Sequence, residues 1–259
     1  MRKLLIVVAV AVAVLVAWHY SSAKPKRAWT TSSQAALDEF GKALEAKMKF
    51  YHMDASEHLR RALELDPDFA AAKVMRMDYV RGAEAKRLLD ELAQTDLDHL
   101  SPREAMMVSF FLASRQGNPE ASRKVAEAFL EKHPKDPYGL SFLCSALEDP
   151  LEQETCYRKL IAVEPNFVLA QNNLGYLAMG QGEFREAEER FRTYQYIAPG
   201  QANPHDSMGE LLVLLGRYDD ARRELEAALA LRPDFDASHT SLVRAALLQE
   251  HVEDAQAAV

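Results

Sequence analysis

The chain of 259 residues contains 40 alanines and 33 leucines but only 10 glycines and 11 prolines, a composition typical of helices. So little glycine and proline excludes a collagen-like chain and disfavours a turn-rich β-sandwich, which leaves a coiled coil or many short packed helices. Residues 1–27 hold five basic and no acidic residues, so the remainder, with 26 basic and 39 acidic residues, carries a formal charge of −13. A body this acidic is poorly suited to bind the phosphates of nucleic acid.

The N-terminus has the pattern of a targeting segment. An uninterrupted apolar run extends from Leu4 to Trp18, and small residues follow at positions 21–23. This pattern fits a signal peptide cleaved near Ala23, and it also fits a membrane anchor over residues 4–23, which would measure about 30 Å as a helix. We therefore expect a body that is tethered to a membrane or exported, and that is periplasmic if the source is bacterial.

Prolines mark a regular interval in the second half of the chain. Pro165, Pro199 and Pro233 lie 34 residues apart. Each interval holds two helical stretches joined by a short turn, and the proline stands where the second stretch must end. A fixed period of this length predicts stacked helix pairs, and the prolines exclude a continuous coiled coil.

A less regular form of the same interval extends toward the N-terminus. If Pro67 and Pro134 are equivalent to the later prolines, helix pairs begin near residues 36 and 103, with a further pair over 70–100 and a shortened pair over 137–166. The sequence thus predicts a set of regions along the chain: a leader (1–27), degenerate helical repeats (28–167), two regular repeats (168–235) and a partial repeat (236–259).

The two regular repeats contain the phrases LGYLAMGQGEFREAEERF…AP and MGELLVLLGRYDDARREL…RP. Small or aromatic residues at the eighth, eleventh, twentieth and twenty-fourth positions, with proline at the thirty-second, resemble the tetratricopeptide repeat. The resemblance is specific over residues 168–235. It implies an all-α solenoid of antiparallel helix pairs that stack into a right-handed superhelix, with a concave face that binds proteins or peptides.

Packing between the helices of the regular repeats is expected at six positions. A glycine recurs at the eighth position of each repeat although it costs about 1 kcal/mol in a helix relative to alanine, which predicts a close approach of two helices. We expect alanines at the twentieth position to face these glycines. The expected packing residues are Gly175, Ala187, Phe191, Gly209, Ala221 and Leu225.

The two cysteines flank the Asp149–Pro150 turn at nearly equal distances. In an antiparallel helix hairpin, Cys144 and Cys156 would lie at similar heights, within reach of a disulfide. Whether the bond forms depends on the compartment: an exported body favours it, whereas buried thiols are expected in a cytoplasm.

Motifs for catalysis are missing from the sequence, which contains no HExxH, GxSxG, P-loop, GxGxxG or CxxC pattern. We therefore expect no enzyme activity, no cofactor and no bound metal. His205 and His239 occupy the same position in successive repeats. We expect them to pack between repeats, with pH or metal sensing as the alternative.

The resemblance also implies which side chains line the concave face. In the family these stand at positions 2, 5, 9, 12 and 13 of each first helix, and the residues selected here are Asn172, Tyr176, Met179, Asn203, Asp206, Glu210, Val213 and Arg244. The Lys and Asn residues with which some members clamp a carboxylate tail are absent. Because Asp206 and Glu210 stand in the groove instead, we expect a basic or mixed polar and apolar partner segment, the alternative being an unused solvated surface.

The function implied is a protein-binding scaffold or adaptor that recruits partners to an envelope assembly. Its partners would be other proteins or peptide segments, together with the membrane through residues 4–23 if the leader is retained, and no nucleic acid is expected. The alternative is a helical sensor region of a bacterial signalling system that acts in trans or as a fragment, because HLSPREAMMVSFFLASRQGN resembles such regions.

Overall fold

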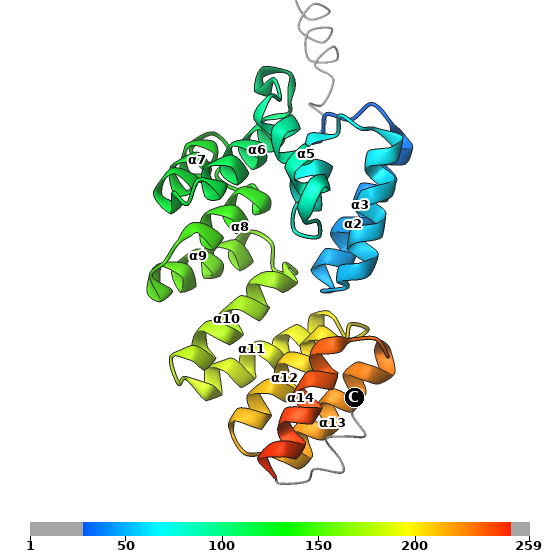
Figure 1. The fold of residues 1–259 in the computed structure, drawn as a ribbon. Coiled ribbons are helices and arrows are strands. Elements are labelled where there is room, and N and C mark those ends of the chain that lie inside the picture. Colours follow the sequence, from blue (N-terminus) through cyan, green and yellow to red (C-terminus); the bar gives the residue numbers. More distant parts are fainter. Residues whose placement is uncertain (1–27, 250–259) are drawn as a thin grey trace, which may run out of the picture.

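The computed structural model describes residues 28–249 and consists, over that range, of thirteen α-helices and one 3-10 turn (Figure 1). The helices are α2 (Gln34–Met48), α3 (His52–Leu65), α4 (Ala70–Arg76), α5 (Gly82–Ala93), α6 (Pro102–Arg115), α7 (Pro119–Lys132), α8 (Pro137–Ala146), α9 (Pro150–Val163), α10 (Val168–Gly180), α11 (Phe184–Ile197), α12 (Asn203–Leu214), α13 (Tyr218–Leu231) and α14 (Asp236–Leu248), with η1 (Leu97–His99) between α5 and α6. Residues 28–249 contain no strand. The predicted all-α solenoid is confirmed.

Consecutive helices form six antiparallel pairs, from α2 with α3 to α12 with α13, and α14 packs on the last pair. Four helices in the middle of the array, α6 to α9, begin with the same local signal, a capping side chain followed by proline. The caps are Ser101, Asn118, Asp136 and Asp149, and each accepts a hydrogen bond from a backbone N–H of the first turn. Such a residue satisfies donors that the helix leaves open, and proline is pre-organised for the next position.

Over residues 28–249 the core consists of four apolar clusters, each of which draws side chains from more than one helix pair. One apolar cluster extends from Phe40 in α2 to Leu174 in α10 and includes the fully buried Met107 and Leu140. Such a chain of interfaces is what holds a repeat array together, since no single pair can bury its own apolar face.

The two regular repeats contain the predicted close helix approach. A Cβ added at Gly175 would lie 2.3 Å from the ring of Phe191, and one at Gly209 would lie 2.6 Å from Leu225. That Ala187 and Ala221 face the glycines stays a prediction. Both alanines are buried, but the large side chains one helical turn further along the second helix contact the glycine surface.

The array curves back on itself, so that α2 and α3 approach the C-terminal helices (Figure 1). Met48 at the end of α2 packs with the cluster of Val168, Tyr194 and Ala198. A short arm before α2 adds a second connection, because Trp29 lies edge-on against Phe40 and Tyr138 at 4.9 and 5.6 Å between ring centroids. The first helix pair thus contacts both the middle and the end of the array.

Within residues 28–249 every helix is too short or too polar to cross a membrane. The predicted leader, residues 1–27, lies outside the described range.

Candidate protein-binding cavity

A cavity of about 770 Å³ lies on the inner face of the array. Its walls come from the first helices of four pairs (α2, α4, α6 and α8), from α9 and from the start of α10. Its volume falls within the roughly 300–1,000 Å³ range of ligand pockets, enough for a short peptide segment. The lining residues are Leu44, Lys47, Met48, Val74, Met75, Met77, Asp78, Arg81, Phe110, Phe111, Ser114, Arg115, Tyr138, Ser141, Phe142, Ser145, Tyr157, Phe167, Leu169 and Asn173.

Aromatic and methionine side chains form much of this wall. The rings of Phe110 and Phe142 pack edge to face with centroids 4.9 Å apart, which joins α6 to α8 across the cavity floor. Methionines from α2 and α4 add flexible apolar surface, which adapts readily to a bound side chain. The wall is thus suited to apolar groups of a ligand.

The charged residues of the wall are mainly basic. Lys47 is paired with Asp78 at 2.6 Å. Arg81 donates to the backbone carbonyl of Val80 at 2.7 Å, and the Arg115 guanidinium lies 5.5 Å from the centre of the Phe111 ring. Within residues 28–249 no ion pair joins either arginine to a carboxylate, so the cavity has two uncompensated positive charges beside an aromatic floor.

The predicted groove residues of the regular repeats lie elsewhere, and half of them are buried. Asn172, Asn203, Asp206 and Val213 are buried, which corrects their assignment to an exposed groove. Asn172 accepts hydrogen bonds from Ser207 at 2.9 Å and from Asn203 at 3.3 Å. These polar groups join α10 to α12 because adjacent first helices pack closely enough to bury them.

The acidic pair expected to select a basic partner is also engaged within the protein. Ser238 of α14 donates a hydrogen bond to Asp206 at 2.7 Å, and burial raises the pKa of Asp206 to about 6. The Tyr176 hydroxyl donates to Glu210. Burial of Tyr176, together with the Glu210 carboxylate beside it, raises the pKa of that hydroxyl well above its ordinary range. Tyr176, Met179 and Glu210 are half-buried, and only Arg244 of the predicted set is exposed.

The cavity residues were missed because the repeat signature is weak before residue 168. One signal was available: six of the seven residues at positions 106–112 of α6 are large and apolar, all except Ser109, which is more than one face of a helix holds. An excess of this kind indicates a second apolar surface, which here faces the cavity.

His205 and His239, which occupy the same repeat position, contact different residues. His205 lies 2.7 Å from Glu224 and 3.2 Å from Gln195, whereas the Nε2 of His239 lies 2.9 Å from the Pro233 carbonyl oxygen. Among residues 28–249 no group of three His, Cys, Asp or Glu side chains could hold a metal ion. From α12, His205 contacts one residue of α11 and one of α13.

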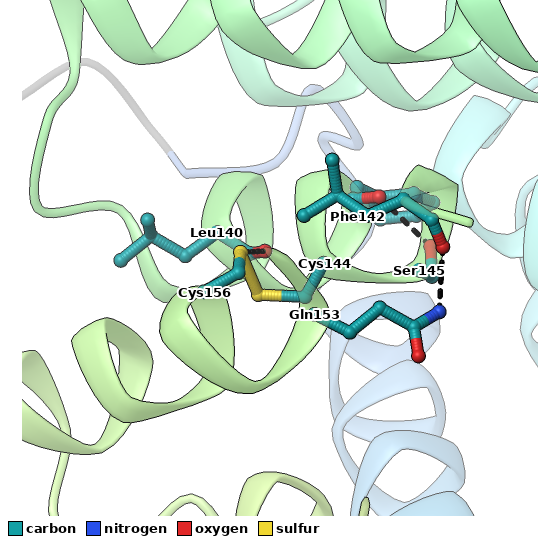
Figure 2. Close-up of a disulfide and its surroundings, with 7 residues drawn as sticks. Leu140, Phe142, Cys144, Ser145, Gln153 and Cys156 are labelled. Carbon is teal, nitrogen blue, oxygen red and sulfur yellow. Dashed lines mark hydrogen bonds between the residues drawn. A yellow bond between two sulfur atoms is a disulfide. The ribbon is translucent and has the colours of Figure 1, made fainter. Parts of the chain in front are cut away.

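A disulfide joins Cys144 at the end of α8 to Cys156 in α9, with the two Cα atoms 5.4 Å apart (Figure 2). Gln153 reinforces the same turn by donating to the Leu147 carbonyl at 2.5 Å. Because α8 supplies Tyr138, Ser141, Phe142 and Ser145 to the cavity, the bond fastens one cavity wall to the outer helix of its pair.

Antiparallel helix pairs stacked around an inner cavity define an α-solenoid repeat protein. Residues 154–202 and 207–259 match the model of the tetratricopeptide repeat family. These two segments are thus similar to the tetratricopeptide repeat, in agreement with the resemblance that the sequence shows over residues 168–235.

The chain is 29% identical over 182 residues to a TPR repeat-containing protein of Pseudomonas aeruginosa, an alignment that covers 66% of this chain and 30% of that protein. Among solved structures, a tetratricopeptide repeat protein from Parabacteroides merdae has a TM-score of 0.52 at 16% identity, with 87% of this chain and 77% of that chain covered. MamA from Desulfovibrio magneticus has a TM-score of 0.51 at 17% identity, with 61% and 91% covered. At these identities the structures support the fold alone.

Proposed function

We propose that this protein is a non-catalytic binding scaffold whose inner cavity takes up a segment of another protein that combines acidic with apolar side chains. The observation that carries this proposal is the pair of exposed arginines, Arg81 and Arg115, beside an aromatic and methionine-rich wall. An arginine without a protein carboxylate is available for a charge-assisted hydrogen bond, which is stronger than a neutral one.

The sign of the partner's charge reverses the sequence-based expectation. That expectation rested on Asp206 and Glu210, and both now have partners inside the protein. Their replacement by lysine would not be a clean binding test, because a lysine at position 206 would be buried without a counter-charge. The cavity arginines therefore support an acidic partner more strongly than Asp206 and Glu210 support a basic one.

We further propose that residues 1–27 tether or export the scaffold, so that it recruits partners to an envelope assembly. The apolar run from Leu4 to Trp18 supports this, and so does the disulfide, because such bonds persist in oxidising compartments.

A titration with two fluorescent peptides tests the binding proposal. One peptide combines Glu with Leu and Phe, and the other has Lys in place of every Glu. We expect the acidic peptide to bind more tightly, and the double variant Arg81→Ala, Arg115→Ala to bind it at least about tenfold more weakly, since hydrogen bonds to charged groups contribute about 1.5–3 kcal/mol each.

The matched control is Arg192→Ala, which removes an exposed arginine of α11 that is paired with Glu188 at 2.5 Å. This variant should bind the acidic peptide as the unchanged protein does. Equal binding of the two peptides, or no effect of the cavity arginines, would overturn the proposal.

A further inference from the structure

The two ends of the repeat array touch at one small interface, which we name the closing contact. One side consists of Phe50 and Tyr51 from the turn between α2 and α3, and of Asp54 from the first turn of α3. On the other side stand Arg232 and Phe235 from the turn between α13 and α14. These residues are about 180 positions apart in sequence, as the Asp54–Arg232 pair shows with a separation of 178.

Phe50 adopts a backbone conformation that large residues avoid. Its φ is +60°, and it is the only residue other than glycine with a positive φ among residues 28–249. In this left-handed region the Cβ of a residue other than glycine crowds the following carbonyl oxygen, which is unfavourable.

The same turn position is a glycine in three other helix pairs. Gly117, Gly182 and Gly216 have φ of +67°, +77° and +70°. Each stands between the last residues of a first helix and the start of a second. The turn at Phe50 also has the same backbone hydrogen bond as the turn at Gly182. The Tyr51 N–H donates to the Ala46 carbonyl at 2.9 Å, and the N–H of the residue after Gly182 donates to the Ala178 carbonyl at 2.8 Å. The fold therefore accepts glycine at position 50, and the local turn gives no reason for phenylalanine.

The side chain of Phe50 has its partners at the other end of the array. It packs, together with Tyr51, against the apolar cluster of Ala202, Ala228 and Phe235, and the rings of Tyr51 and Phe235 lie 6.4 Å apart. Phe50 is half-buried there, and the apolar surface that it removes from water offsets the backbone cost. The strained residue is thus retained at the point where the array closes.

Arg232 supplies the polar half of the contact. Its guanidinium donates to both carboxylate oxygens of Asp54, at 2.8 and 3.0 Å, and lies 4.6 Å from the centre of the Tyr51 ring. These hydrogen bonds hold the pKa of Asp54 below its usual value. Arg232 also pairs with Asp234 of its own turn at 2.5 Å, which fixes the direction of its side chain.

Closure also completes the cavity. One part of the wall is formed by Lys47 and Met48 of α2, and another part by Phe167, Leu169 and Asn173 at the start of α10. Met48, two residues before Phe50, connects the two features, because it packs with Val168 and Tyr194 and also lines the cavity. If the closing contact separates, these two parts of the wall separate with it.

We infer that the closing contact, built from Phe50, Tyr51, Asp54, Arg232 and Phe235, is a latch that holds the array in a ring and assembles the cavity from its two ends. A ligand that touches both parts of the wall binds the closed form better, so occupancy and closure must favour one another. The coupling to a ligand rests on the proposed function, whereas the latch itself is measured on the free protein.

The latch is tested by a distance measurement in the full chain. Spin labels are placed on introduced cysteines, Glu64→Cys on α3 and Glu226→Cys on α13, both at exposed positions; within residues 28–249 the native cysteines are bonded to each other. We expect one narrow distance distribution for the unchanged latch. Phe50→Gly, which suits the turn, and Arg232→Ala should each lengthen and broaden it.

The control is Arg123→Ala. It removes an ion pair between neighbouring helix pairs, in which Arg123 lies 3.0 Å from Glu152, away from the latch. Its distance distribution should match that of the parent. If Phe50→Gly and Arg232→Ala also leave the distribution unchanged while helix content is normal, the latch is overturned.

Addition of the Glu, Leu and Phe peptide tests the coupling. In Phe50→Gly it should restore the short distance, with an affinity at least about tenfold weaker than for the parent. Equal affinity for the parent and Phe50→Gly would overturn the coupling. If the peptide binds none of the proteins, the proposed acidic and apolar partner fails, while the free-protein distances still decide the latch.

Discussion

At the scale of single residues, the carboxyl group of Asp206 shows how the first helices use their polar side chains. It is 3% exposed and lies between α12 and α14, where it accepts a hydrogen bond from Ser238. Burial raises its pKa to about 6, and the nearby Glu210 adds to the shift. The unfolded chain has a value near 4 for this group. The folded state therefore binds the proton more tightly than the unfolded state does.

The sign of this shift gives a prediction for stability. The favourable contribution of protonated Asp206 is fully present below about pH 4 and is lost as the pH rises through about 6. Asp206→Asn should therefore stabilise the fold at pH 7, by up to about 3 kcal/mol, and should change it little at pH 4. Denaturant unfolding of both proteins across this range measures the difference.

The control is Asp98→Asn, which changes an exposed aspartate of η1. It should shift stability by no more than about 0.5 kcal/mol at either pH. A parallel pH profile for the parent and Asp206→Asn would contradict the account of this carboxyl.

The sequence could assign Asp206 to a position in the repeat but not to its surroundings. Repeat phase places position 206 on the concave side of α12, among the expected groove residues. It does not tell how far α14 approaches that side. The small residue Ser238 allows α14 to come close enough to cover the carboxylate, and that depends on packing between repeats.

At the scale of helices, the glycines of the regular repeats permit close packing. Gly175→Ala gains up to about 1 kcal/mol of helix propensity. It also places a methyl group 2.3 Å from the ring of Phe191, which is fully buried and cannot move aside cheaply. We expect a net destabilisation of about 1–3 kcal/mol in denaturant unfolding, because overpacking costs more than propensity supplies.

Gly41 of α2 provides a matched control, because a Cβ there would meet nothing within 4 Å. Gly41→Ala should stabilise the protein by about 0.5–1 kcal/mol. If Gly175→Ala raises the free energy of unfolding as Gly41→Ala does, the close approach of α10 and α11 is not the reason for glycine at position 175.

The disulfide constrains the pair formed by α8 and α9. A link between cysteines 12 positions apart removes unfolded-chain entropy worth about 3 kcal/mol. We predict that Cys144→Ala, Cys156→Ala lowers the unfolding free energy by about 2–3 kcal/mol, and that reductant has this effect on the parent but not on the variant. Mass spectrometry of protein from its native compartment should find no free thiol, and two free thiols would contradict both the bond and the proposed export.

Helix boundaries were the most predictable feature of the chain. The pairs of a capping residue and proline at 101, 118, 136 and 149 each begin a helix, since they act through local chemistry. The predicted pair at 70–100 is less regular, with α4 only 7 residues long. Every residue of α4 is buried, so packing from several sides sustains a helix that local propensity would not.

At the scale of the whole molecule, the curvature of the array decides which surface is available. Sequence periodicity predicts that neighbouring pairs stack, but the meeting of Phe50 with Phe235 depends on small rotations summed over all pairs. The one local sign was a phenylalanine at a turn position that carries glycine in other pairs. The cavity could not be predicted for the same reason, because its walls come from α2, α4, α6, α8 and α10 together.

The central claim is that the inner cavity is the binding site, and a steric block tests it most directly. Ser141 of α8 lines the cavity and is half-buried, so Ser141→Trp fills part of the space, whereas Thr193→Trp adds the same side chain at an exposed position of α11. The measurement is the affinity for the Glu, Leu and Phe peptide by fluorescence anisotropy. We predict a loss of at least about tenfold for Ser141→Trp with unchanged helix content, and no loss for Thr193→Trp. Equal affinity of the two variants would contradict the account.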